Sequence, residues 1–401
     1  MMPPIAGVAT SQTADNSVVS SQVQQGDVTS SQTLDVVTVT DTTAGTTTAT
    51  GDSITAGSDV GSLDVRSTQS MQGAATTTLN VETDGAAGDV GITTAATGNT
   101  GEADSLGGAP LTGNLRQSTG PNTISAVSRI EAADGQTGDV VDDTQAIGNT
   151  MGVAVAGSTA TVSVSQSATG STVTDGGMNL GYSPGEADLA ASSVSNNITA
   201  TGLDGGSQTL TLNQSMTGTM TQSAQFVAVG QAQAVNNATT ASANNISVSN
   251  DGGPLDVVAA QDNQGYVRGQ AESTAFSFGT SSAVASGVGN SAIYGETGGP
   301  ITLNSSQTNS GAGVEAVASS GGAVGYDLTS SATAMGNAVT GYACSACGGV
   351  MNVASSQSNT ADIGATSSIP YAGTAGAVRS AISTATAVGN SATFYVSRPS
   401  N

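Results

Sequence analysis

The sequence predicts an all-β protein, a parallel β-helix or β-solenoid of about eight repeats of about 48 residues, with two or three coils in each repeat. Three observations lead to this class. Two series of amide residues recur at near-constant spacing, short runs alternate apolar and polar residues, and no window has the i, i+3, i+4, i+7 apolar spacing of an amphipathic helix. We therefore expect a stack of short strands.

Glutamines form the first series, and each follows a short alternating run such as TVSVS at residues 161–165. The successive intervals, by subtraction, are 37, 48, 49, 48, 47, 46 and 50 residues, and the series is Gln32, Gln69, Gln117, Gln166, Gln214, Gln261, Gln307 and Gln357. Because the first interval is short, we expect an incomplete N-terminal repeat.

Asparagines form the second series, usually after glycine, and each lies 29 to 33 residues after a glutamine of the first series: Asn99, Asn149, Asn197, Asn245, Asn290, Asn337 and Asn390. Identical amides at one position of successive units can hydrogen-bond to one another as a ladder. The alternative for the asparagines is a left-handed corner, which the Gly-Asn context also favours.

Each repeat offers about three short strand candidates, and glycine pairs mark the turns between them. A solenoid coil typically takes about 20 to 25 residues, so a 48-residue unit predicts two coils or three. Eight repeats of two coils, at about 4.8 Å for each coil, would form a rod about 75 Å long.

The composition narrows the function. The chain has 29 acidic residues, six basic residues and a net charge of −23, and all six basic residues are arginine. Nucleic acid is therefore a poor partner, because binding to its backbone requires clustered cations. The acidic charge keeps the chain soluble or attracts Ca²⁺ or a basic partner. No apolar run approaches the length of about 18 residues that a membrane-spanning helix needs.

The residues that most catalysis requires are scarce, so we predict no enzyme and no cofactor. Histidine and lysine are absent, and no metal site is expected. The densest acidic cluster is Asp139, Asp142 and Asp143, which could hold a metal or act as paired carboxylates. The alternative is a solvated loop, which the absence of an EF-hand spacing favours.

We divide the chain into three parts. Residues 1–29 form an N-terminal segment, read as a signal remnant and cap or as a flexible terminus. Residues 30–383 form the repeats, and residues 384–401 form a capping or docking strand. Cys344 and Cys347 are candidates for a local disulfide, and Phe394, Tyr395 and Arg398 for partner docking.

The recurring Ser-Ala-x-Ala-x-Gly-Asn pattern, with the segment TATAVGNSATF at residues 384–394, resembles the D-type holdfast anchor protein of stalked alphaproteobacteria. The resemblance spans the chain from about residue 30 onward. It implies a secreted protein at the outer membrane of the cell pole. Such a protein fastens an adhesive polysaccharide to the cell together with a fibre-forming A-type subunit and a B-type outer-membrane pore.

Two other classes are kept as alternatives. A self-assembling, amyloid-like or fibre-forming adhesin subunit would use the amide series and the low charge density for self-association. A phage tail-spike or a polysaccharide-cleaving β-helix would share the architecture alone. In each case the C-terminal strand, the cysteine loop and the short first unit are where we expect partners to bind.

Overall fold

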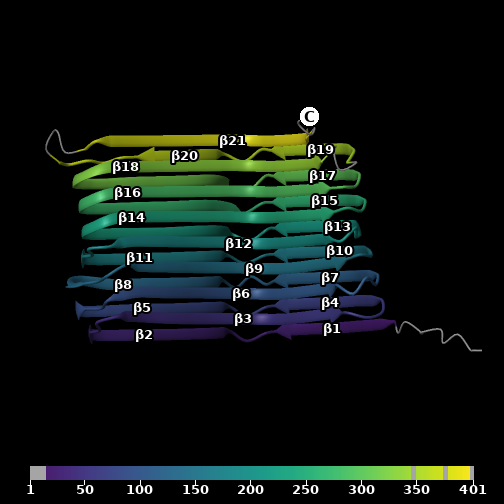
Figure 1. The fold of residues 1–401 in the computed structure, drawn as a ribbon, viewed down its shortest axis with the longest axis horizontal. Helices are drawn as coiled ribbons and strands as arrows, with labels where there is room; N and C mark the ends of the chain where they lie inside the picture. Colours follow the sequence, from purple (N-terminus) through teal and green to yellow (C-terminus); the bar gives the residue numbers. More distant parts are fainter. Residues whose placement is uncertain (1–14, 345–348, 374–377, 398–401) are drawn as a thin grey trace, which may run out of the picture.

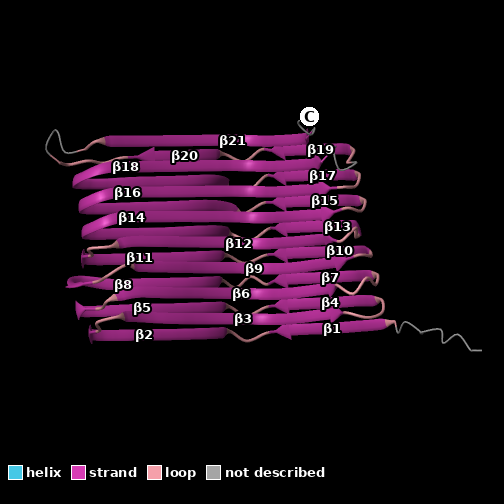
Figure 2. Cartoon of the chain, viewed as in Figure 1, coloured by secondary structure: helices cyan, strands magenta, loops and turns pink. Residues whose placement is uncertain are grey.

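The computed structural model describes residues 15–344, 349–373 and 378–397, and its secondary structure is all β (Figure 1; Figure 2). Neighbouring strands are parallel in every pair. The predicted all-β parallel architecture is confirmed. No helix long and apolar enough to span a membrane occurs in the described ranges.

The first set of strands carries the glutamine series and forms one eight-stranded sheet. Their alternating sequences place every second side chain in the interior, as period two requires. The set comprises β1 (Asn16–Gln24), β4 (Leu63–Met71), β7 (Leu111–Thr119), β10 (Thr159–Ala168), β13 (Ser207–Met216), β15 (Leu255–Asn263), β17 (Ile301–Asn309) and β19 (Met351–Asn359).

The other strands form a second sheet with two parts. Its first part comprises β2 (Val28–Thr38), β5 (Ala75–Ala86), β8 (Ile124–Gln136), β11 (Thr172–Tyr182) and β20 (Ile363–Ser368). Its second part comprises β3 (Thr42–Ser58), β6 (Asp89–Ser105), β9 (Val140–Ala156), β12 (Glu186–Leu203) and β21 (Ser380–Ser397). In three coils both parts join into one strand, namely β14 (Met220–Asp251), β16 (Tyr266–Thr297) and β18 (Gly313–Cys344).

One repeat makes one coil. Gln69 lies opposite Gln117 and Asn99 lies opposite Asn149 in directly paired strands, so each residue meets its equivalent one whole repeat later. The expectation of two or three coils per repeat is wrong. The last strand of each coil is long, 17 residues in β9, and a coil with such a wide face consumes the whole unit.

The coils are flattened into two layers. Strands such as β7 and β8 lie end to end in one layer, and β9 lies against both in the other (Figure 1). Eight coils at about 4.8 Å per coil rise about 34 Å, whereas a 17-residue strand spans about 55 Å. The described part of the chain is therefore a broad slab, and the expected rod is wrong.

The solenoid begins earlier than expected. Strand β1 starts at Asn16, inside the segment assigned to a terminus, and its Gln22 pairs with Gln69. Gln32 lies in β2 opposite Leu79, so it does not belong to the glutamine column. The first interval is thus 69 − 22 = 47 residues, and the first repeat is complete. The C-terminal boundary moves too, because β21 crosses residues 383 and 384 without interruption.

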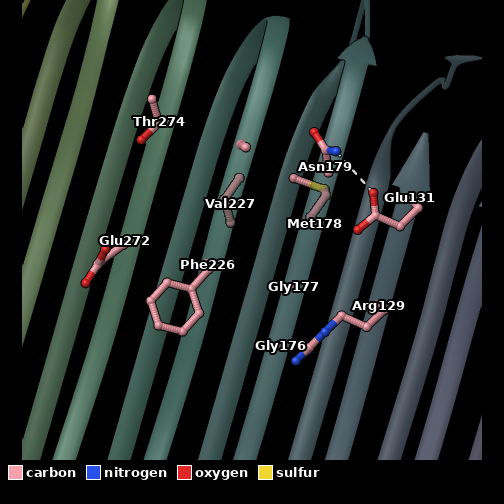
Figure 3. A pocket seen from close by; sticks show the side chains of 11 residues that line it. Arg129, Glu131, Gly176, Gly177, Met178, Asn179, Phe226, Val227, Glu272 and Thr274 are labelled. Atoms are coloured by element: carbon pink, nitrogen blue, oxygen red, sulfur yellow. Dashed lines mark hydrogen bonds between the residues drawn. The ribbon is translucent and has the colours of Figure 1, made fainter. Parts of the chain in front are cut away.

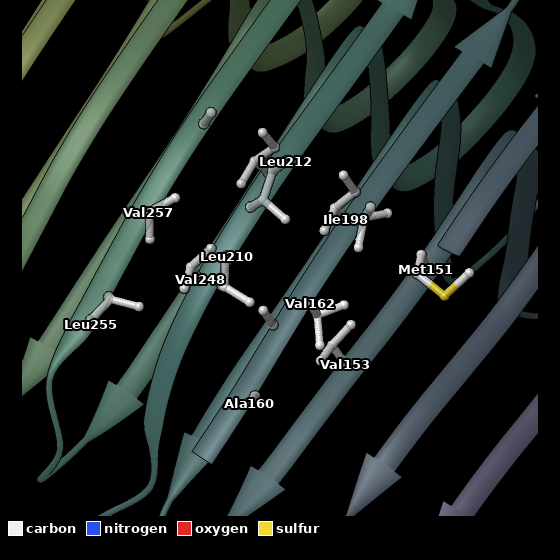
Figure 4. Close-up of a cluster of buried hydrophobic side chains, with 14 of the residues drawn as sticks. Met151, Val153, Ala160, Val162, Ile198, Leu210, Leu212, Val248, Leu255 and Val257 are labelled. Atoms are coloured by element: carbon white, nitrogen blue, oxygen red, sulfur yellow. The ribbon is translucent and has the colours of Figure 1, made fainter. Parts of the chain in front are cut away.

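The core lies between the two layers and is made of small and β-branched side chains in columns along the stack. Figure 4 shows Val162, Leu210 and Val257 of the first layer beside Val153 and Val248 of the second. Each of these side chains is at most 3% exposed. Stacked residues of similar size fill most of this thin core, and Tyr294 and Phe278 are the aromatic side chains that the described part buries there, which fits the low aromatic content.

In each long strand the alternation of buried and exposed side chains shifts by one residue at the ladder asparagine, or at Asp52 in the first coil. In β9 both Gly148 and Asn149 are buried, and the register with β12 passes from Ile147 opposite Val194 directly to Asn149 opposite Asn196. A Cβ atom on Gly148 would lie 2.4 Å from the carbonyl oxygen of Ser195. In β9 the glycine therefore lets this coil approach the next one closely, whereas Ser195 and Ala243 take the same position in β12 and β14.

Substituting this glycine should be costly. We expect Gly148→Ala to lower the free energy of unfolding by about 2 to 4 kcal/mol, because the backbone of the next coil must shift. Gly152→Ala is the matched control, since a Cβ there would meet its nearest neighbour at 3.7 Å, an ordinary contact. Urea denaturation measures both variants. Equal stability of the two would contradict the account of the irregularity.

Candidate functional site

The glutamines form a continuous ladder through the whole described stack. From the second member onward, each Nε2 donates to Oε1 of the glutamine one coil earlier at 2.7 to 2.9 Å, and the members are Gln22, Gln69, Gln117, Gln166, Gln214, Gln261, Gln307 and Gln357. Each Nε2 also donates to a backbone carbonyl of the long strand in its own coil at 2.8 to 2.9 Å. The ladder thus joins neighbouring coils and both layers.

The asparagines form a second ladder of opposite polarity. In every member before the last, Nδ2 donates to Oδ1 of the asparagine one coil later at 2.7 to 2.9 Å, and the members are Asn99, Asn149, Asn196, Asn244, Asn290, Asn337 and Asn390. The six members before Asn390 also donate to a backbone carbonyl at 2.7 to 3.0 Å. None has a positive φ, so the corner alternative is wrong within the described ranges.

Two members of the predicted asparagine series were misplaced by one residue. Asn197 and Asn245 follow the ladder residues Asn196 and Asn244 and point away from the ladder. They pair with each other instead, Asn245 Nδ2 donating to Asn197 Oδ1 at 2.8 Å. Both positions carry Asn-Asn, and the change of phase at the irregularity puts the first of each pair inside.

The second ladder begins with a carboxylate. Asp52 occupies the column position of Asn99 one coil earlier and accepts the backbone N–H of Ser70 at 3.1 Å. An ionised carboxylate cannot donate, and Asn99 Oδ1 is buried without a hydrogen-bond partner. Burial also raises the pKa of the Asp52 carboxyl, while the bond from Ser70 opposes that rise.

Asp52→Asn should complete this ladder. An amide at position 52 can donate to Asn99 Oδ1, and satisfying a buried acceptor stabilises by about 1 to 3 kcal/mol. Because burial raises the pKa of Asp52, its contribution to stability is present at low pH and declines as the pH rises through the folded-state pKa. The difference between variant and parent should therefore grow from acid to neutral pH. Thermal unfolding at several pH values measures it, and a less stable variant would contradict this assignment.

The predicted acidic cluster is not a single site. Asp142 points into the interior and is 1% exposed, whereas Asp143 points outward from the same strand. Asp139 lies at the corner before β9, where its Oδ1 accepts the backbone N–H of Glu186 at 3.0 Å. Within the described ranges no group of three or more His, Cys, Asp or Glu residues is placed to hold a metal ion. The three carboxylates thus do not converge on one site. Asp139 lies in an exposed corner and Asp143 faces outward, as the solvated-loop alternative expects, whereas Asp142 is buried.

Asp142 belongs to a polar patch within the core. The hydroxyls of Ser128 and Thr144 donate to its two oxygens at 2.7 and 3.0 Å. Burial raises the pKa of Asp142 to about 6, although these two hydrogen bonds and one from Gln225 lower it. A buried carboxyl in this position is poorly suited to contact an external ligand.

A shallow groove of about 390 Å³ crosses the outer face of the second sheet (Figure 3). Gly177 lies at its floor, opposite Arg129 in one neighbouring strand and Phe226 in the other. Asn179 Nδ2 donates to Glu131 Oε2 at 3.1 Å along one side. The absent side chain of Gly177 creates the hollow. Neither the glutamine series nor the asparagine series indicated this groove.

The aromatic residues of the last strand lie at the C-terminal end of the stack. Phe394 packs on Gly341, where an added Cβ would lie 2.7 Å from Phe394 Cδ1. The ring of Tyr395 stacks on that of Tyr342 with centroids 6.1 Å apart. Both residues remain exposed, at 38% and 59%.

The disulfide candidate and the docking candidate Arg398 lie partly or wholly outside the described residues. Cys344 ends β18 and is 9% exposed, but Cys347 falls outside the described residues. The proposed local disulfide between them stays a prediction. Arg398, the third docking candidate, also lies outside the described residues.

A family model described as holdfast attachment protein D matches residues 37–313, which is more than half of the chain. The chain belongs to the holdfast attachment protein D family. The resemblance inferred from the recurring motif is confirmed. No curated protein and no solved structure matches the chain.

Membership in the holdfast attachment protein D family indicates a structural role at the cell surface. The match runs from the end of β2 to the start of β18, so it covers most of both ladders. Strands β19 and β21 lie beyond it and still carry Gln357 and Asn390 in the two columns. The family architecture thus continues through the last coil.

Proposed function

We propose that this chain is a secreted, non-enzymatic surface protein that anchors an adhesive holdfast polysaccharide to the outer membrane at the cell pole. Its partners in this proposal are an outer-membrane secretion pore and fibre-forming anchor subunits. The family match supports the attachment role. The observation that carries the mechanical part is the pair of amide ladders, of which the glutamine ladder joins all eight described coils and the asparagine ladder the last seven.

An anchor must resist the loss of single coils under load. Every described coil is held to its neighbours by parallel backbone hydrogen bonds along both sheets and by the glutamine ladder, and from the second coil onward the asparagine ladder adds a further side-chain bond. The glutamine ladder also ties the two layers together through the backbone carbonyls of the long strands. A buried amide that loses its partner costs about 1 to 3 kcal/mol, so opening one coil breaks several costly contacts together.

Deleting the gene tests the attachment role. Cells without the protein should still make the adhesive but shed it into the medium, and a labelled lectin would detect it there and not on the washed cells. Complementation with the parent chain should restore retention. Unchanged retention in the deletion strain would contradict the proposal.

The partners require a separate measurement. A tagged copy of the chain, isolated from outer membranes in mild detergent, should co-purify with a pore protein and a small fibre subunit. Glycan analysis of the same sample shows whether the polysaccharide is held directly. Recovery of the chain alone would contradict anchoring through protein partners.

A further inference from the structure

Both ends of the solenoid are open over the described ranges. Strands β1, β2 and β3 form one end and β19, β20 and β21 the other, and none of the described elements covers either end. Ala385 and Ala387 of β21 are exposed, whereas their counterparts Ala332 and Ala334, one coil earlier, are fully buried. Such edges are templates for further strands of the same kind.

We propose that the C-terminal end of one molecule binds the N-terminal end of a second copy of this chain, in register, so that the solenoid continues across the junction. This contact is heterologous and does not close on itself, so it generates an open series of molecules. The inference rests on the two ends of the structure and is independent of the attachment function.

The glutamine ladder has complementary ends. Each glutamine from Gln22 to Gln307 accepts at Oε1 from the next coil, and Gln357 Oε1 has no such donor within the described part. At the other end, Gln22 Nε2 donates to the Ser53 carbonyl and, unlike every later glutamine, to no earlier amide. Gln22 of a second copy, placed one coil above Gln357, would supply the missing donor.

The asparagine ladder has complementary ends of the opposite polarity. Asn390 accepts from Asn337 at 2.7 Å, and no described acceptor lies beyond its own Nδ2. The first position of the same column is Asp52, whose carboxylate can only accept when ionised. Asn390 of one copy would therefore donate to Asp52 of the next, in a charge-assisted hydrogen bond stronger than that between two amides.

Charge also favours this orientation. Residues that pair from coil to coil form a column, and Thr43 and Ala381 are the first and last members of one such column. Asp41 lies two residues before Thr43, and Arg379 lies two residues before Ala381. A second copy in register would place the exposed Asp41 above Arg379, whose exposed guanidinium also pairs with Asp327 of its own molecule. Joining two C-terminal ends would instead run the strands antiparallel, and it would bring together two ladder ends that both lack a donor in the described part and two copies of Arg379.

The net charge of −23 opposes association and predicts its salt dependence. Like-charged molecules repel over a Debye length of about 10 Å at 0.1 M salt and less at higher salt. Added salt should therefore promote the stacking of copies until it also screens the pair of Asp41 and Arg379.

Mixed cysteine variants test the junction. Ser21 and Ser356 are outward-facing first and last members of one column, so the junction would bring their Cα atoms to about 4.8 Å, within disulfide range. Mixing Ser21→Cys and Ser356→Cys chains under mild oxidation should give a 21–356 bond by mass spectrometry. Ser21→Cys with Ala354→Cys is the matched control, displaced by two residues along the strand. Absence of the 21–356 bond, or an equal yield in the control, would overturn the proposal.

Charge exchange gives a second, independent test. Arg379→Asp should weaken association in sedimentation velocity at least tenfold, and the double variant Asp41→Arg/Arg379→Asp should restore it. Circular dichroism of each variant checks that the fold is retained. A chain that stays monomeric at every concentration and salt, or a double variant no better than the single one, would overturn the proposal.

Discussion

Replacing Gln214 with leucine is expected to lower the free energy of unfolding by about 3 to 6 kcal/mol. Gln214 Nε2 donates to Gln166 Oε1 at 2.9 Å and to the Asn245 carbonyl at 2.8 Å, and its Oε1 accepts from Gln261 at 2.8 Å. Leucine fills a similar volume but leaves these buried partners unsatisfied, each at a cost of about 1 to 3 kcal/mol. Urea denaturation followed by circular dichroism measures the loss.

Asn213→Ala is the control for this experiment. Asn213 precedes Gln214 in β13 but faces outward and is exposed, so we expect a change within about 0.5 kcal/mol. Hydrogen exchange should show faster opening in the coils on both sides of position 214 in the leucine variant. If the Gln214→Leu variant were as stable as the parent protein, the glutamine ladder would not stabilise the fold.

The second large effect is a gain of stability from Asp142→Asn. The pKa of Asp142 is raised from 3.8 to about 6, chiefly by burial, so keeping the ionised form in the core at pH 7 costs about 3 kcal/mol, at about 1.4 kcal/mol per pKa unit. Asparagine has nearly the same shape and no charge. We expect the variant to be more stable than the parent by up to about 3 kcal/mol at pH 7.

The pH dependence fixes the sign of this prediction. Because the folded-state pKa is raised, the contribution of Asp142 to stability is fully present below pH 3.8 and is lost as the pH rises through about 6. The advantage of Asp142→Asn should therefore shrink on acidification from pH 7 to pH 4. Asp143→Asn, one residue away and facing outward, is the control and should change stability little. An unchanged or lower stability of the Asp142 variant at pH 7 would show that the carboxylate is needed by its hydroxyl partners.

The sequence predicted the parallel solenoid and most of both ladders because a column of identical residues leaves a direct mark at the repeat period. Gln117 and Gln166 are 49 residues apart and adjacent in the sheet. The number of coils per repeat produces no recurring residue pattern of this kind. It depends on how far the chain runs before it turns, and strands of 32 residues such as β14 pass through a corner without a break.

The misplaced residues have a local cause. At Asn196-Asn197 and Asn244-Asn245 the pattern of residue types does not show which amide points inward, since the strand changes phase there. Gln22 was overlooked because Gln32 also follows an alternating run. Which amide belongs to the ladder depends on which side chain is buried, and a single sequence does not show this.

The groove and the open ends were beyond prediction for a different reason. Gly177 forms a hollow only because Arg129 and Phe226 flank it from coils 48 or 49 residues away. Likewise, Asp52 is recognised as the first member of the asparagine column only when the register with Asn99 is known. These features come from neighbours that the coil brings together.

The central claim, that one repeat makes one coil, is tested most directly by a disulfide between positions 165 and 213. Ser165 and Asn213 face outward on paired strands, so their Cα atoms lie about 4.8 Å apart, within disulfide range. With one coil per repeat, the double variant Ser165→Cys/Asn213→Cys should form this intramolecular bond in nearly every molecule. With two coils per repeat, the positions would be about 9.6 Å apart, and the absence of the bond in a folded variant would contradict the claim.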